Sequence, residues 1–355
     1  MASHGTSLSH LCQCFRGVLP KDIDWLSVIS LANQTLTTPA LQDVAEHFSD
    51  DIPEDVRRYV SEIFARNLVR NDRLTQQLTE ALAALNARGI TPILLKGSAM
   101  LATSPRIKMG RRLVTDLDLM VSPDEVEPAL DCLQSLGYRI HLKTPDGTAK
   151  WYADLARPDD VGMIDLHQCP PGHRFFYGAA DSVRQHCRLQ GAAYVPSATY
   201  HALMLIIHDQ FQDSDYWVGK IDLRHLLDLR DLANSPDGID WNLLASLASG
   251  KLARNAIETQ LVTLNSLLGV SVPDSMRGRV MPRLQYWRRR LQAHLPVSRH
   301  ALFLLLLFDY GNYRAGLGLE ERAARRLAPR KWILPRIETL RFLLDRAYEE
   351  RPGKV

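Results

Sequence analysis

The chain has 355 residues, of which 46% are apolar and 23% are charged. This composition excludes a disordered, collagen-like or low-complexity protein and is typical of a globular one. The net charge of +3 is too small to indicate a partner, and five irregularly placed cysteines give neither a disulfide framework nor a zinc motif. No apolar run approaches the roughly 20 residues of a membrane-spanning helix, so we expect a cytoplasmic protein that does not enter a membrane.

The first part of the chain, residues 1–89, has helical patterns. In its last segment Leu74, Leu78 and Leu85 recur on one helix face. Asn71 is a possible N-cap of this helix, and Gly89 is a suitable residue to end it. We therefore expect an N-terminal helical region over residues 1–89.

From residue 90 the pattern changes to short apolar runs, which predict strands over 91–95, 117–121, 138–142 and 162–167. Between the second and third runs, Ser122, Pro123 and Glu125 form a capping box that starts a helix, and Gly137 ends it. Strand, helix and strand together predict a β-α-β unit.

Helical patterns return after Pro196, most clearly over 200–210 and 221–232. The expected fold is α+β, with a small sheet between two helical layers. The predicted division is an N-terminal helical region (1–89), an α/β core (90–195) and a C-terminal helical region (196–355).

Acidic side chains on two of the predicted strands are the first candidates for chemistry. Because side chains alternate along a strand, Asp116 and Asp118 point to one face while Leu117 and Leu119 point into the core. The same alternation adds Asp165 to that face if the two strands are neighbours. Three carboxylates repel one another unless a cation lies between them, and oxygen ligands favour Mg²⁺ or Mn²⁺.

The pattern Asp-x-Asp alone is weak evidence, because it occurs twice more in this chain. Asp22 and Asp24 form one copy, and Asp213 and Asp215 form the other. Neither copy opens an apolar strand, and the second lies in a polar stretch that is typical of a loop. We interpret both copies as solvated acids.

Several groups near these acids are candidates for binding phosphate. Gly97 and Ser98 directly follow a predicted strand, and a turn at this point exposes backbone N–H groups to phosphate oxygens; alone, such a pair is only a turn. The candidate side chains are Lys96, Arg111, Arg112, His167, Lys220 and Arg224. For His167 a packed histidine is an equally good interpretation. Lys220 and Arg224 form one stripe with Asp228, which an ordinary ion-paired helix face also explains.

The order of these motifs resembles a known superfamily. The chain reads Leu95-Lys-Gly97, then Arg111, then Asp116-Leu-Asp-Leu119 and finally Asp165-Leu-His167. It is similar to the DNA polymerase β-type nucleotidyltransferases, and more narrowly to a bacterial group within that superfamily. The resemblance covers roughly residues 89–168, with a weaker match over 200–232.

The resemblance implies a polymerase β-type sheet and a role for each matched residue. Gly97 and Ser98 would hold the terminal phosphates of an NTP such as ATP. Asp116 and Asp118 would bind two divalent metals, and Asp165 would share one of them and help to deprotonate the acceptor. The implied activity is Mg²⁺-dependent transfer of an NMP from an NTP to an acceptor, with release of pyrophosphate.

Two other functions remain open at this point. One is a regulatory protein that binds nucleotide without turnover. The other is a nucleotidyltransferase that modifies tRNA, because basic residues at 288–290 and 322–331 alternate with Tyr286, Trp287 and Trp332. An ordinary solvated helix face explains that basic segment equally well. The acceptor is thus an unknown small molecule, protein or tRNA.

Overall fold

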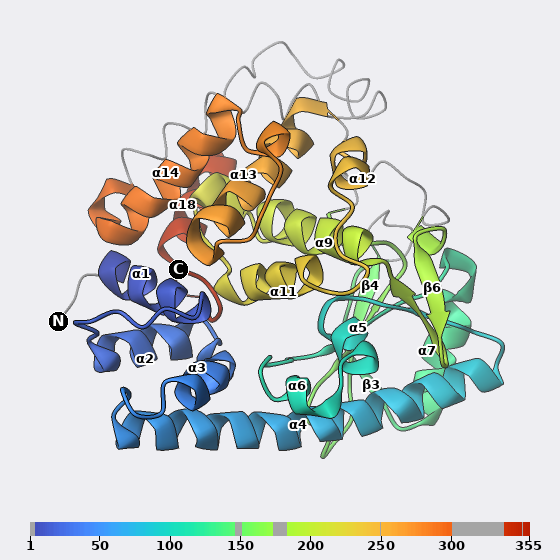
Figure 1. Cartoon of the computed structure of the whole chain (residues 1–355). Coiled ribbons are helices and arrows are strands. Elements are labelled where there is room, and N and C mark those ends of the chain that lie inside the picture. The colour runs from blue at the N-terminus through green and yellow to red at the C-terminus, as the bar shows by residue number, and fades with distance from the viewer. Residues whose placement is uncertain (1–3, 146–150, 173–182, 249, 300–336, 350) are drawn as a thin grey trace, which may run out of the picture.

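Figure 1 shows the computed structural model of the chain, which describes residues 4–145, 151–172, 183–248, 250–299, 337–349 and 351–355. The fold is α+β, as predicted: helices surround a seven-stranded mixed sheet. The strands are β1 (Ile93–Leu94), β2 (Leu117–Met120), β3 (Arg139–Lys143), β4 (Tyr152–Ala156), β5 (Ile164–His167), β6 (Cys187–Gln190) and β7 (Ala193–Pro196).

The helices fall into three groups along the chain. Those before the sheet are α1 (His4–Phe15), α2 (Trp25–Gln34), α3 (Gln42–His47) and α4 (Glu54–Ala87). Those within the sheet region are α5 (Lys96–Thr103), α6 (Arg106–Met109) and α7 (Val126–Ser135). Those after it are α9 (Ala198–Ile207), α10 (Asp215–Val218), α11 (Leu223–Ala233), α12 (Trp241–Ser246), α13 (Gly250–Leu268), α14 (Val280–His294) and α18 (Ile337–Tyr348).

The strand order is β3-β4-β5-β2-β1-β7-β6. Strands β2 and β5 are parallel neighbours, as are β1 and β7, whereas the other pairs are antiparallel. The four predicted strands are β1, β2, β3 and β5; strands β4, β6 and β7 were not predicted. The capping box of Ser122 and Glu125 is present, and α7 follows it. The β2-α7-β3 unit exists, but β5 and β4 lie between its two strands.

One face of the sheet forms a hydrophobic core. Leu117 and Leu119 of β2 and Ile164 and Leu166 of β5 are fully buried. They belong to one cluster with apolar residues of α4 and α7. Because side chains alternate, the residues between them point to the opposite face, which lies toward the C-terminal helices.

Helix α4 runs along the sheet region as a single helix of 34 residues (Figure 1). The predicted N-cap, Asn71, is wrong: it lies inside α4 and is buried. Its amide donates to the carbonyl oxygens of Met109 (2.7 Å) and Arg112 (2.8 Å). Asn67, one turn earlier, donates to Gly110 and Arg112. Helix α4 therefore supplies hydrogen-bond donors to the backbone carbonyl oxygens of the loop that leads into β2.

The N-terminal helices pack on helices from the C-terminal part of the chain. Leu8 and Leu11 of α1 share a core cluster with Leu261 and Leu264 of α13. In Figure 1 the blue helices accordingly lie next to the helices coloured yellow to red. None of the helices in the described ranges is long and apolar enough to cross a membrane.

Two of the three arginines at 288–290 are not part of the solvated or RNA-binding face that the sequence allowed. Arg288 and Arg289 are 2% and 1% exposed. Arg288 donates to the carbonyl oxygens of Tyr216 and Trp217, and Arg289 to the side chains of Gln210 and Gln260. These two arginines stabilise the packing of α14. The basic residues at 322–331 and Trp332 lie outside the described residues.

Candidate active site

Three carboxylates form a row across adjacent strands on the polar face of the sheet. Asp118 of β2 is in direct register with Asp165 of β5, and Asp165 is in register with Asp154 of β4. The ligand atoms of Asp118, Asp165 and His167 lie within 4.8 Å of one another. The two predicted strands are thus neighbours, and their acids converge. Asp154 was not predicted, although Ala153 and Leu155 on either side show the same alternation as β2.

This row lies in a cavity of about 480 Å³ between the sheet and the C-terminal helices. Asp116, which precedes β2, also lines the cavity, and its Oδ1 accepts a hydrogen bond from Thr115 (3.1 Å). The wall residues used in the following argument are Lys96, Gly97, Arg112, Asp116, Asp118, Asp154, Asp165, His167, His208, Arg224 and His225. All three predicted acids therefore line one cavity.

Asp118 is almost completely buried and is paired on one oxygen only. Its Oδ1 lies 2.7 Å from Lys96 Nζ and 3.3 Å from His167 Nε2. Burial would raise the pKa of Asp118, but the charges of Lys96 and His167 dominate and hold it well below its usual range. Its second oxygen, Oδ2, is buried and has no hydrogen-bond partner among the residues that the structure describes. Asp118 is therefore an ionised carboxylate with one free ligand atom.

Asp165 has the opposite electrostatic environment. Burial, together with the negative charges of Asp118, Asp116 and Asp154, raises the pKa of Asp165 to about 8. Burial also raises the pKa of Asp154. A carboxyl group in this position binds either a proton or a cation near neutral pH.

Helix α5 begins at the cavity, directly after β1. Lys96 is its first residue and has a φ of +44°, which is unusual for a residue with a side chain. Gly97 lines the cavity, and a Cβ atom at this position would lie 2.9 Å from Arg112 Nη1 and from Val114 Cγ1. Ser98 is fully buried, and its hydroxyl has no hydrogen-bond partner. The predicted Gly-Ser pair thus brings Gly97, but not the Ser98 side chain, to the cavity wall.

The predicted cations separate into two groups. Arg112 and Arg224 line the cavity; Arg112 Nε lies 2.8 Å from Asp228 Oδ1, while Arg224 Nε is buried without a partner. Arg111 instead pairs with Asp43 at 2.7 Å and is not in the cavity wall.

Lys220 is also outside the cavity wall. It donates to the carbonyl oxygen of Glu349 and lies before the start of α11. The predicted polar stripe of Lys220, Arg224 and Asp228 is therefore wrong, because only the last two belong to that helix. Arg224 faces the cavity, and Asp228 pairs with Arg112, which also lines it.

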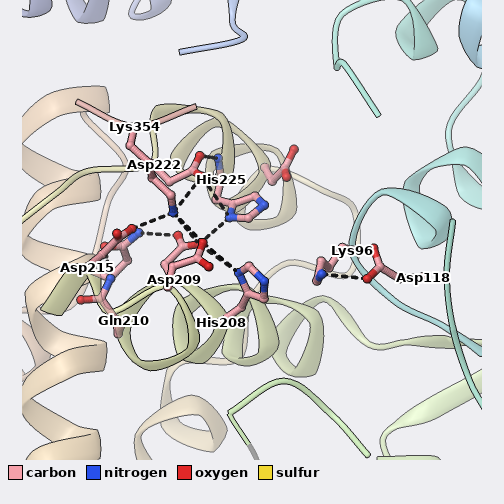
Figure 2. A network of polar contacts seen from close by, with 12 residues as sticks. Lys96, Asp118, His208, Asp209, Gln210, Asp215, Asp222, His225 and Lys354 are labelled. Carbon is pink, nitrogen blue, oxygen red and sulfur yellow. Dashed lines mark hydrogen bonds and ion pairs between the residues drawn. The ribbon is translucent and has the colours of Figure 1, made fainter. Parts of the chain in front are cut away.

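Sequence patterns did not identify the wall formed by His208 and His225. His208 begins a π-helical turn, His208–Gln212, a form of helix that is frequent at functional sites. His225 Nδ1 lies 2.6 Å from Asp209 Oδ1. Figure 2 shows both imidazoles on the side of Asp209 that faces Lys96 and Asp118. Two histidines from separate elements meet here only because of tertiary packing.

The two other copies of Asp-x-Asp lie in different structural environments. Asp24 is the N-cap of α2, where it accepts a hydrogen bond from the Ser27 N–H. The interpretation of Asp213 and Asp215 as solvated acids is wrong. Asp215 is 2% exposed, and both carboxylates contact Lys354, at 2.9 and 2.7 Å.

Adjacent carboxylates, the start of a helix and two arginines thus line one cavity. The family follows from the sequence: residues 21–269 match the model of the family described as "Uncharacterised nucleotidyltransferase". Because this match spans most of the chain, the protein belongs to that family and is a nucleotidyltransferase. The predicted resemblance is thereby confirmed.

Other comparisons add little. No curated protein matches the chain. Among solved structures, the solution structure of the antibiotic-resistance factor ANT(2'')-Ia is similar, with 16% sequence identity over 54% of this chain and 92% of that one. Its TM-score is 0.31, a value at which the similarity supports no conclusion about this protein.

Proposed function

We propose that the protein transfers an NMP from an NTP to an acceptor, with release of pyrophosphate, and that Asp116, Asp118 and Asp165 bind the Mg²⁺ or Mn²⁺ ions this reaction needs. The observation that carries the proposal is the direct register of Asp118 and Asp165 at the cavity, with Asp118 Oδ2 left unpartnered. Residues 90–195 would be the catalytic core.

The residues fit divalent cations of this kind. Carboxylate oxygens are the ligands that Mg²⁺ and Mn²⁺ prefer. The buried Oδ2 of Asp118 lacks the partner that a buried acceptor normally has. Repulsion among the acids, expressed in the raised pKa of Asp165, would be relieved by a cation. When bound, such ions stabilise charge on the entering and leaving oxygens of an in-line displacement.

The chain's own groups would bind and orient the NTP. Arg224 and Arg112 would contact phosphate oxygens from the helical side of the cavity, and the backbone at Gly97 would do so from the start of α5. Lys96 and His167 would contact either Asp118, as they do in this structure, or a phosphate. Asp165 would take the proton of the acceptor hydroxyl. The acceptor oxygen would then bond to the α-phosphorus, while the bond to the bridging oxygen breaks and pyrophosphate leaves.

The proposal is tested by incubating the protein with Mg²⁺, each α-labelled NTP and fractionated cell extract. We expect label on one fraction and an equal amount of pyrophosphate. Asp116→Asn and Asp118→Asn together should lower the rate by at least about 10²-fold, since each change removes an anionic ligand. Transfer that is absent in the wild type, or equal in wild type and variant, would contradict the proposal. The identity of the labelled fraction would distinguish a small molecule, a protein and tRNA as acceptor.

A second candidate function is nucleotide binding without turnover. It is favoured by one observation, the Lys96 ammonium that already neutralises Asp118 at 2.7 Å. This alternative predicts NTP binding with no pyrophosphate release. It also predicts that Lys96→Met abolishes NTP binding, whereas an enzyme would keep weak binding and measurable transfer.

A further inference from the structure

Lys354 lies in a buried nest of carboxylates behind the histidine wall of the cavity. Its side chain is 6% exposed. Its Nζ lies 2.7 Å from Asp215 Oδ2, 2.9 Å from Asp213 Oδ2, 3.1 Å from Asp222 Oδ2 and 3.7 Å from Asp209 Oδ1. Figure 2 shows the ammonium between Asp215 on one side and Asp222 and Asp209 on the other. Four acids are thus held by one lysine that is far from them in sequence.

The backbone of residues 351–355 fixes this lysine at the start of α11. Val355 exchanges two main-chain hydrogen bonds with Ile221, at 2.9 and 3.2 Å. Gly353 donates to the carbonyl oxygen of Gln34 (2.7 Å) and has a φ of +92°, a conformation that favours glycine. The segment therefore joins the end of α2 to the residue before α11, and its last three residues are buried.

The nest is connected to the cavity through His225. Asp209 and Asp222, two of the acids that Lys354 holds, lie 2.6 and 3.6 Å from His225 Nδ1. Burial lowers the pKa of His225, but these two carboxylates outweigh burial and raise it. The two carboxylates thus favour the protonated form of His225. With Nδ1 directed to Asp209, the rest of the ring lines the cavity next to Arg224.

The cation in this nest of carboxylates is the Lys354 ammonium, a group of the protein itself. Asp209, His208 and His225 are close enough to hold a metal ion. However, Asp209 Oδ1 is already shared by His225 Nδ1 and the Lys354 ammonium. An unbalanced group of four carboxylates beside the cavity would repel a triphosphate, and the lysine reduces that repulsion.

We propose that Lys354 is a positioning residue of the nucleotide site: by holding Asp209 and Asp222 it fixes His225 against the cavity, where His225 and Arg224 bind the β- and γ-phosphates. The inference deepens the proposed function and rests on it for the identity of the ligand. The phosphates would then lie between the carboxylate row on the sheet and a cationic wall on α11.

The test uses inorganic tripolyphosphate as the probe, with EDTA present and the full chain, so that it needs no nucleotidyl transfer. The variants are His225→Gln, Lys354→Met, and Lys354→Met combined with Asp215→Asn. The double variant removes the lysine together with one of the acids that it contacts, and it keeps the test decisive if the single lysine variant does not fold. The matched control is Lys251→Met, an exposed lysine on α13. Circular dichroism confirms that each variant is folded.

We expect calorimetry to give about tenfold weaker tripolyphosphate binding for His225→Gln and for the folded Lys354 variant, because each loses a charge-assisted contact. Lys251→Met should bind like the wild type. In the transfer assay, the folded Lys354 variant should raise KM for the NTP about tenfold and leave kcat within about threefold, a split that general loss of structure would not give.

The inference is overturned if the wild type does not bind tripolyphosphate, or if the folded Lys354 variant binds it as tightly as the wild type. Failure of the proposed function has a different signature, namely no label transfer in the wild type together with intact tripolyphosphate binding. A lysine variant that lowers kcat and leaves KM unchanged also contradicts a role in holding the phosphate wall.

Discussion

Replacing Asp165 with asparagine is expected to slow transfer strongly while stabilising the metal-free fold. Asp165 lies in register between Asp118 and Asp154. Burial and the neighbouring acids raise the pKa of Asp165 from its usual 3.8 to about 8. Near neutral pH the folded protein must therefore take up a proton at this site or carry an unfavourable charge, and the unfolded chain need do neither.

The size of the effect follows from the two pKa values. A carboxyl group whose pKa is raised on folding contributes its full stabilisation at pH values below its pKa in the unfolded chain. That contribution is lost as the pH rises, here between about 4 and about 8. At pH 7 the pH exceeds the usual pKa of 3.8 by about three units, which corresponds to roughly 4 kcal/mol at about 1.4 kcal/mol per pH unit. Relaxation around the site would reduce this, so we expect a gain of about 2–4 kcal/mol for Asp165→Asn.

Urea unfolding in EDTA at pH 5 and pH 7.5 measures this gain. The advantage of Asp165→Asn over the wild type should be larger at pH 7.5. Asp131→Asn, at an exposed acid on α7, serves as the control and should change neither value by more than about 0.5 kcal/mol. Transfer by Asp165→Asn should fall by about 10²-fold or more. The reasoning is refuted if this variant is less stable than the wild type at pH 7.5, or if its advantage does not depend on pH.

Three further changes test how the site is assembled. A double-mutant cycle of Arg112→Met and Asp228→Asn should give a coupling energy of about 1–3 kcal/mol in urea unfolding, since this ion pair is largely buried. A coupling energy near zero would show that the pair does not join the sheet to α11. Asn71→Ala should cost about 1–3 kcal/mol of stability, because the Met109 carbonyl loses its amide donor and the Arg112 carbonyl keeps only the donor from Asn67; unchanged stability would contradict the role assigned to α4. Gly97→Ala should weaken tripolyphosphate binding in calorimetry by about tenfold, because its Cβ would displace the Arg112 guanidinium and Val114; tight binding by this variant would argue against phosphate at the start of α5.

Local patterns predicted the parts of the site that lie on strands. Alternation placed Asp116 and Asp118 away from the core, and the same rule, applied to the later strand, gave Asp165. The capping box at Ser122 is likewise a local feature, and the structure contains it. The face of each strand and the capping box depend on residues that are only a few positions apart, whereas the meeting of Asp118 and Asp165 depends on the pairing of β2 with β5.

The opposite wall of the cavity depends on contacts between distant segments. His225 faces the cavity because Asp209 and residue 354 fix the start of α11. Asn71 looks like a cap in the sequence, yet it pairs with a loop some 40 residues later. Arg288 and Arg289 look like a solvated or nucleic-acid-binding surface, but partners in other helices bury them. No local pattern contains the information that decides these cases.

Two of the Asp-x-Asp copies, Asp116 with Asp118 and Asp213 with Asp215, show what distinguishes an acid pair with a structural role from a pair of candidate metal ligands. At Asp213 and Asp215 the chain brings its own cation, since Lys354 contacts both carboxylates. At Asp118 the chain also supplies a lysine, but Lys96 contacts Oδ1 only, and Oδ2 remains buried without a partner. Asp165, in register beside Asp118, keeps a raised pKa because burial and the neighbouring acids outweigh the charge of Lys96. A second cation can therefore bind at the strand pair, whereas Lys354 already contacts all four carboxylates of the nest, which is why the proposed metal site lies on the sheet rather than in the nest.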